Sequence, residues 1–144
     1  MQTIRTKNLL KEAGIEATPA RLRVLDICIS AGQPLTVEDV AKKVGGKAHL
    51  ATVYRTLEKF VISGILTRID FQEGKFRYEY VVDHHHHAIC ESCGSIAEIK
   101  DNNLENVMHT LKVGRGFSIS RHALELFGLC HGCQLKGSHV KRTS

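Results

Sequence analysis

The sequence predicts an α+β protein in two parts, with helices and a β-hairpin in residues 1–82 and a metal-binding α/β part in residues 83–136. Three observations predict this division. Apolar residues recur at helical spacing up to Gly64, two strand-like runs follow around a polar turn, and two CxxC pairs lie in the remaining sequence. We expect residues 137–144 to form a flexible basic tail.

The first helices are marked by residues that favour helix ends. Thr18 followed by Pro19 is an N-cap with a favourable first helical residue, and apolar residues then continue at helical spacing up to Gly32. A shorter helix is expected before it, over residues 8–13, with Gly14 at its end.

Two further helices follow along the chain. Thr36 with Asp39 three residues later resembles a capping box, and the apolar stripe of the helix it starts stops at Gly45. After a short turn, the next helix has an apolar face that runs from Val53 to Gly64.

This last helix carries polar and basic residues opposite its apolar face. Thr52, Arg55 and Lys59 lie there, and Tyr54 flanks them. Such a helix after a tight turn is typical of a helix-turn-helix that reads the major groove of DNA. The alternative is an ordinary amphipathic helix with a solvated face, because exposed Arg and Lys are common on any helix.

A hairpin is expected after the helices. Residues 65–71 and 76–82 are strand-like runs on either side of the polar segment 72–75. A hairpin with so polar a turn fits a wing beside the DNA backbone, so residues 1–82 are predicted to form a winged helix-turn-helix.

Two cysteine pairs, Cys90 with Cys93 and Cys130 with Cys133, predict a structural zinc site. Each CxxC turn offers two sulfurs to one ion, and Zn²⁺ takes four tetrahedral ligands. The alternatives are two disulfides or free core thiols. Disulfides fit poorly, because nothing at the N-terminus reads as a signal peptide and reducing compartments keep thiols free. The fifth cysteine, Cys28, lies in an apolar stretch and is expected to be a core residue.

An unbroken run of four histidines precedes the first cysteine pair. In an extended strand His85 and His87 would share one face, while His84 and His86 would share the other. One strand is therefore expected to supply two metal sites. The alternatives are a nonspecific metal-storage tract and a solvated turn. A purification tag is not expected, because tags lie at a terminus and this run is internal.

Further donors lie within reach in the sequence, although each one taken singly is more often a surface residue. They are Glu79 in the preceding strand, Glu98 in the run 95–99, Glu105 on a helix expected over 103–113, and His122 in the alternating run 117–127. His109, one helical turn after Glu105, is a weaker candidate.

Composition adds little to these motifs. The formal charge of +5 and the pI near 9.0 are mild evidence for a polyanionic partner, but neither half of the chain is a basic arm. No apolar run is long enough to span a bilayer, so we expect a soluble, cytoplasmic protein without a membrane partner.

A series of motifs runs in order through nearly the whole chain. They are TPAR at 18–21, ATVYRTL at 51–57, RYE at 77–79, HHHH followed by CESCG within 84–94, and HALELFGLCHGC at 122–133. Together they resemble the ferric uptake regulator family of bacterial metal-responsive repressors. The resemblance implies a winged-helix DNA-binding domain joined to an α/β dimerisation domain, and a homodimer that binds double-stranded operator DNA when a regulatory metal is bound.

The resemblance also implies roles for particular residues. It places structural zinc on Cys90, Cys93, Cys130 and Cys133. It places a regulatory iron, zinc or manganese ion on Glu79, His85, His87 and Glu98, and an additional metal on His84, His86, Glu105 and His122. For DNA it implies Tyr54 and Arg55 as base readers. Thr52 and Lys59 on the same exposed helix face, together with Arg21, complete the predicted DNA contacts.

Two positions depart from the family pattern. Gln33 stands where the family commonly has a histidine ligand from the DNA-binding domain, and an amide is a far poorer transition-metal ligand than imidazole. Glu16 stands where many members place a lysine in the minor groove, and an acid there would repel phosphate. We therefore expect altered coupling between domains and an altered DNA target.

Two other functions compete with a metal-responsive repressor. One is a constitutive DNA-binding protein that uses zinc only to fold, which the change at Gln33 would favour. The other is a metallohydrolase in which His85, His87 and a glutamate hold zinc with an open water position, but no HExxH-like helix accompanies them. Peroxide sensing is less favoured than iron or zinc sensing, because peroxide-sensing relatives usually have aspartates at the positions of Glu79 and Glu98.

Overall fold

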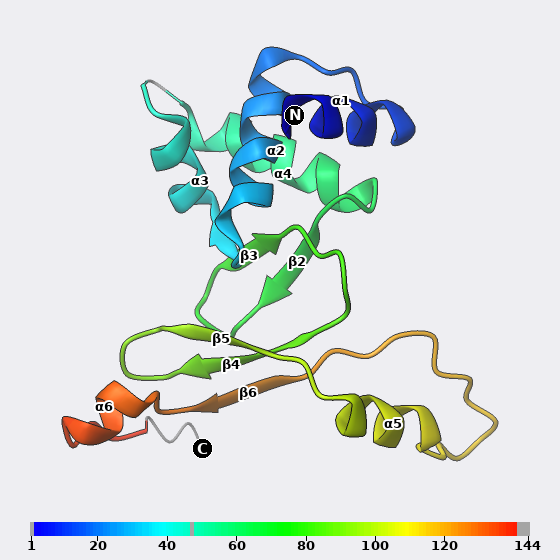
Figure 1. Cartoon of the computed structure of the whole chain (residues 1–144), viewed down its shortest axis with the longest axis vertical. Helices are drawn as coiled ribbons and strands as arrows, with labels where there is room; N and C mark the ends of the chain where they lie inside the picture. Colours follow the sequence, from blue (N-terminus) through cyan, green and yellow to red (C-terminus); the bar gives the residue numbers. More distant parts are fainter. Residues whose placement is uncertain (1, 47, 141–144) are drawn as a thin grey trace. The chain divides into compact units, whose positions relative to one another are not determined.

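The computed structural model describes residues 2–46 and 48–140, and it divides into two compact units, residues 1–82 and 83–144. The first unit contains α1 (Gln2–Glu12), α2 (Pro19–Ala31), β1 (Leu35–Thr36), α3 (Val37–Val44), α4 (Leu50–Ile62), β2 (Thr67–Asp70) and β3 (Phe76–Glu79) (Figure 1). The second contains β4 (His86–Cys90), β5 (Ile96–Ile99), α5 (Asn102–Thr110), β6 (Glu125–Gly128) and α6 (His131–Leu135). Within the described residues, no helix is both long and apolar enough to cross a membrane.

The ends of α2 and α3 follow from local chemistry. The Thr18 hydroxyl accepts a hydrogen bond from the Arg21 amide at 3.3 Å, and α2 ends at Gly32 in the left-handed region, with φ 61°. At the start of α3, the Thr36 hydroxyl accepts from the Asp39 amide while the Asp39 carboxylate accepts from the Thr36 amide. This is the predicted capping box, and it is confirmed.

The first helix is longer than the sequence indicated. It was expected over residues 8–13, but α1 begins at Gln2. The reason is tertiary: Thr6 and Leu10, one turn apart, are both fully buried, and the Thr6 hydroxyl donates to the Asp26 carboxylate on α2. Burial of this face stabilises a first turn that its own sequence favours only weakly.

One hydrophobic core holds the first unit together. Its fully buried members come from α1, α2, α3, α4 and β3, and they are Leu10, Leu25, Val40, Leu57, Phe60 and Tyr78. The apolar face predicted for the helix of residues 53–64 is thus the face of α4 that packs into this core. Its opposite face remains exposed, as a reading helix requires.

A three-stranded sheet in the order β1-β3-β2 completes the first unit. The antiparallel pair β2 and β3 is the expected hairpin, although each strand is shorter than the runs 65–71 and 76–82. Its turn needs a positive φ at Gln72 and at Gly74. Helices α3 and α4 followed by this hairpin form the predicted winged helix-turn-helix, and the mixed α+β fold class is confirmed.

The second unit is built on a sheet in the order β5-β4-β6, with β4 antiparallel to β5 and parallel to β6. Within the alternating run 117–127 the strand begins only at Glu125, where pairing with β4 starts. The helix expected over 103–113 is α5, Asn102–Thr110. The end of the expected tail, residues 141–144, lies outside the described residues.

Candidate metal centres and nucleic-acid interface

Two chain segments bring the four paired cysteines together. Cys90 ends β4, Cys93 follows in a turn, Cys130 caps α6 and Cys133 lies within α6. Their sulfurs all lie within 4.8 Å of one another, and the Sγ atoms of Cys93 and Cys130 are 3.7 Å apart. Four cysteine sulfurs that converge from the end of a strand with its turn and from the start of a helix are the donor set of a closed tetrahedral zinc site.

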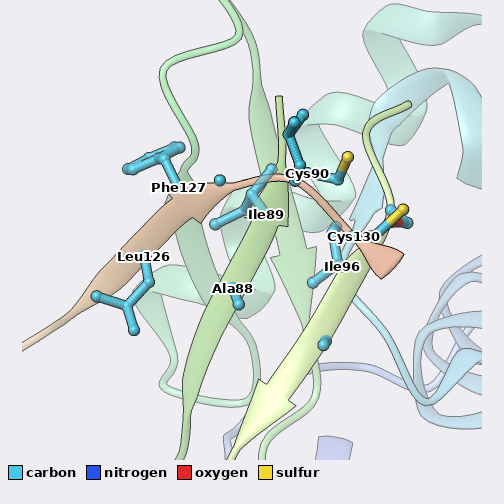
Figure 2. A pocket seen from close by; sticks show the side chains of 11 residues that line it. Ala88, Ile89, Cys90, Ile96, Leu126, Phe127 and Cys130 are labelled. Atoms are coloured by element: carbon cyan, nitrogen blue, oxygen red, sulfur yellow. The ribbon is translucent and has the colours of Figure 1, made fainter. Parts of the chain in front are cut away.

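The surroundings of these sulfurs favour the thiolate form at Cys90 and Cys130, because hydrogen bonds lower the pKa of both thiols. Backbone amides of Cys130 and Cys93 lower the pKa of the Cys90 thiol to about 6. Figure 2 shows the Cys90 and Cys130 sulfurs beside an apolar pocket, which Ile89, Ile96 and Phe127 help to line. Residues of the second unit's sheet and two of the paired cysteines, Cys90 and Cys130, line this same pocket.

A second cluster combines three imidazoles with one carboxylate, all in the second unit. One donor atom each of His84, His86, Glu105 and His122 lies within 4.8 Å of the others. The Glu105 carboxylate is at their centre, 2.6 Å from His86 Nε2 and 3.3 Å from His122 Nε2. His84 Nε2 lies 3.2 Å from His122 Nε2.

The residues of this cluster are positioned by different elements. His86 is the first residue of β4 and is 2% exposed, while Glu105 lies in the first turn of α5. The Asp101 carboxylate caps that turn by accepting from the Asn103 amide at 2.7 Å. His122 comes from the irregular segment before β6, within the alternating run of the sequence.

Hydrogen bonds from the cluster change the acidity of its carboxyl group. Partial burial acts to raise the pKa of Glu105, but hydrogen bonds from His86 and His122 outweigh it and lower that pKa. The group therefore favours the charged form, which is the form that binds a cation. Three nitrogens and one carboxylate suit a divalent transition metal such as Zn²⁺, Fe²⁺, Mn²⁺ or Co²⁺.

The residues proposed for the regulatory metal are only partly brought together in the second unit. The rings of His85 and His87 lie 4.8 Å apart, centre to centre. Glu98 is opposite His87 in the β4–β5 ladder, yet its carboxylate lies 3.3 Å from Lys100 Nζ, so this ammonium group competes with a metal for that carboxylate. Glu79 belongs to the first unit, where it is buried at the end of β3.

All five residues predicted to touch DNA line one shallow groove along α4. They are Arg21, Thr52, Tyr54, Arg55 and Lys59. Four of them come from α4 itself and are exposed, and the aromatic ring among them is 44% exposed. An exposed row of hydroxyl, phenol, guanidinium and ammonium groups can reach both base edges and phosphates.

The fifth of these residues is partly held by its own unit. Arg21 donates to the Glu16 carbonyl oxygen at 2.9 Å, and its guanidinium lies 3.9 Å from the Glu16 carboxylate. The acid that departs from the family pattern is thus next to a candidate DNA contact. Gln33, the other departure, is exposed between Gly32 and the buried Pro34.

Sequence reasoning missed residues that share the groove with these contacts. Thr56, Glu58 and Ile62 also line it. The helical spacing of Glu58 from Tyr54 was the signal that could have found it, because residues four apart lie on one face of a helix.

The model of the ferric uptake regulator family matches residues 12–127 of the chain. This chain belongs to the ferric uptake regulator family. The matched range includes α4, the hairpin and the first cysteine pair. It also includes all four residues of the histidine and carboxylate cluster, and it ends before Cys130.

Individual relatives agree with this assignment. The chain is 39% identical over 130 residues to the ferric uptake regulation protein of Bordetella parapertussis, which covers 87% of this chain and 94% of that one. It is 34% identical over 133 residues to the peroxide operon regulator of Bacillus subtilis, covering 90% and 92%. The crystal structure of the Vibrio cholerae ferric uptake regulator matches with a TM-score of 0.75 and 33% identity, covering 86% and 98%.

Family membership decides between the functions that the sequence left open. The protein is a metal-responsive, DNA-binding regulator of transcription, as the other members of its family are. Members of this family are regulators and not enzymes, so the metallohydrolase alternative is rejected.

Proposed function

We propose that the protein represses transcription as a homodimer whose affinity for operator DNA rises when a regulatory divalent metal is bound. The observation that carries this proposal is the presence, in one chain, of a reading helix with an exposed polar face and of two converging donor clusters. The reading helix supplies the DNA contact, and the clusters supply the response to metal.

The cysteine cluster is proposed to hold structural zinc. Zinc on Cys90, Cys93, Cys130 and Cys133 would join the end of β4 to α6. Because a metal that binds only the folded form adds its binding free energy to folding, this ion would stabilise the second unit.

The histidine sites are proposed to hold the metal that is sensed. The cluster of His84, His86, Glu105 and His122 is supported by its short distances, and the set of Glu79, His85, His87 and Glu98 is carried over from the family pattern. We favour iron or zinc over peroxide as the signal, because glutamates stand at positions 79 and 98.

A homodimer is supported by apolar side chains that the single chain leaves exposed. No residue of helix α5 is fully buried, and Val107 on it is 57% exposed. Leu126 and Phe127 on β6 are 48% and 39% exposed. Such surfaces are typical of an interface with a second copy.

Dimerisation would link metal to DNA through the spacing of the two reading helices. Half-sites on DNA lie one helical turn apart, so only one arrangement of two α4 helices fits both. A metal that favours this arrangement raises DNA affinity, and DNA raises metal affinity by the same factor, on the order of 5- to 150-fold for a coupling of about 1–3 kcal/mol.

Substitutions on α4 test the DNA interface directly. Arg55→Ala should cost about 1–3 kcal/mol on an operator selected from random duplexes, if Arg55 reads a base edge, and should matter less on random DNA. Lys59→Ala should instead weaken binding to both and reduce the salt dependence. Equal losses on operator and random DNA for Arg55→Ala would refute base reading by this residue.

A further inference from the structure

One carboxylate joins the reading helix to both strands of the hairpin. Glu58 Oε1 on α4 accepts from the Tyr78 hydroxyl at 2.6 Å, and Glu58 Oε2 accepts from Arg68 Nη1 at 3.0 Å. Arg68 and Tyr78 are direct partners in the β2–β3 ladder, so their side chains leave the same face of the hairpin. Each strand of the hairpin therefore donates a hydrogen bond to α4, and both bonds go to the carboxylate of Glu58.

Burial makes this contact more than a surface ion pair. Tyr78 is fully buried, and the side chain of Glu58 is 19% exposed. Burial, and then the hydrogen bond to Glu58, raise the pKa of Tyr78 well above its ordinary value, so the phenol stays protonated and acts as the donor. A hydrogen bond from a buried hydroxyl to a charged oxygen is among the stronger kinds in proteins.

Arg68 is held from its other side as well. Its guanidinium carbon lies 4.5 Å from the centre of the Phe76 ring, at the start of β3. The guanidinium thus lies between an aromatic ring of the hairpin and the carboxylate of Glu58 on α4.

The network lies immediately beside the residues that read DNA. Glu58 follows Tyr54 by four positions and Arg55 by three, and it lines the same groove. In Figure 1 the chain passes from α4 directly into the hairpin. Glu58 therefore lies between the predicted reading side chains and the hairpin.

We propose that Glu58 is a positioning residue for DNA recognition. It holds the β2–β3 wing at one orientation to α4. The wing and the reading helix can then bind the same duplex with a smaller loss of conformational entropy. The inference rests on the proposed function, because it requires that α4 and the wing bind DNA together.

A matched ion pair in the same hairpin provides the control. Arg77 donates to both oxygens of Glu73, at 2.8 and 2.9 Å, and both residues belong to the hairpin and its turn. Glu73→Gln removes a carboxylate from an Arg pair as Glu58→Gln does, but it leaves the link to α4 intact.

The experiment compares full-length, metal-loaded variants on two probes, a duplex selected from a random library by the wild-type protein and a random-sequence duplex. Glu58→Gln should lower affinity for the selected duplex about three- to tenfold, and Tyr78→Phe should lower it in the same direction. The double variant should lose no more than Glu58→Gln alone. Tyr78 is too buried to touch DNA, so its effect must pass through the carboxylate.

A second measurement separates positioning from overall stability. Glu58→Gln should speed hydrogen exchange at the amides of β2 and β3 in the free protein, while thermal unfolding shows that all variants are folded. Arg68→Gln, which leaves the bond between Tyr78 and Glu58, should show a smaller loss on the selected duplex.

Three results would overturn the positioning role: equal losses for Glu58→Gln and Glu73→Gln, fully additive losses in the double variant, or unchanged hydrogen exchange in the hairpin. A wild-type protein that selects no duplex would overturn the proposed function itself, and the DNA role of Glu58 with it.

Discussion

His86 Nε2 lies 2.6 Å from Glu105 Oε1, although the two residues are 19 positions apart in the chain. This contact joins the first residue of β4 to the first turn of α5. Two of the proposed metal ligands therefore lie within contact distance in the folded second unit. Ligands that folding holds close together need less ordering on binding.

Removal of the central carboxylate should weaken metal binding at this cluster. Glu105→Gln keeps the size of the side chain but removes its charge, and we expect affinity for a divalent metal to fall by at least about tenfold. Titration with Co²⁺, followed by its absorption spectrum, measures this. His109→Ala is the matched control, because its ring centre is 6.5 Å from that of His122 and it is not among the converging donors. Equal losses in the two variants would contradict the assignment.

Loss of one paired cysteine should remove zinc and destabilise the second unit. Cys90→Ser or Cys130→Ser leaves three thiolates, which no longer close a tetrahedral site. Zinc per chain by elemental analysis, together with gel filtration, should show loss of the ion and of the dimer. Cys28→Ala is the control, since this buried thiol has its pKa raised to about 12 by burial and is not part of the cluster. Retention of one zinc per chain in either serine variant would contradict the prediction.

The capping box of α3 should make part of the stability depend on pH. Partial burial opposes ionisation of Asp39, but hydrogen bonds from the backbone and side chain of Thr36 outweigh it and lower the pKa of Asp39. The folded pKa lies below the unfolded one, so this stabilisation is present above an ordinary carboxyl pKa of about 3.9 and is lost as pH falls through the lower folded value. Asp39→Asn should therefore flatten the fall in unfolding free energy below about pH 4. Urea unfolding at a series of pH values checks this, and an unchanged slope would show that the cap does not titrate in this way.

Gln33→His should strengthen both metal affinity and metal-dependent DNA binding. It restores an imidazole at the position where the family commonly has one, and imidazole binds transition metals far better than an amide does. Parallel titrations of metal and of operator DNA measure the two effects. The gain should vanish in a background that carries His85→Ala and His87→Ala. Unchanged affinity in Gln33→His would mean that position 33 lies away from the metal.

Local signals in the sequence predicted the helices of the first unit best. Thr18 with Pro19, and Thr36 with Asp39, fix helix starts through bonds to amides only a few residues away. Such contacts depend on short stretches of sequence and can be recognised there. The early start of α1 could not be recognised, because it depends on the contact between Thr6 and Asp26 on another helix.

Contacts between distant segments were predicted less well. The segment before β6 alternates as a strand does, but it has no neighbour to pair with until Glu125, so His122 reaches its cluster from irregular backbone. The hydrogen bonds from Arg68 and Tyr78 to Glu58 likewise depend on the register of the β2–β3 ladder, which places the two donors opposite each other. The paired cysteines are the exception, since the ligand spacing of zinc sites is itself a sequence pattern.

Metal binding should raise the affinity for operator DNA. The affinity of the wild-type protein for a selected operator, measured with and without added Fe²⁺ or Zn²⁺, tests this. Zinc at the cysteine cluster is kept in place in both cases, and its content is checked. We expect the metal to strengthen operator binding by roughly 5- to 150-fold, and this effect to shrink in Glu105→Gln or in His85→Ala with His87→Ala. Equal affinity with and without the metal would contradict it and would favour a constitutive DNA-binding protein that uses zinc only to fold.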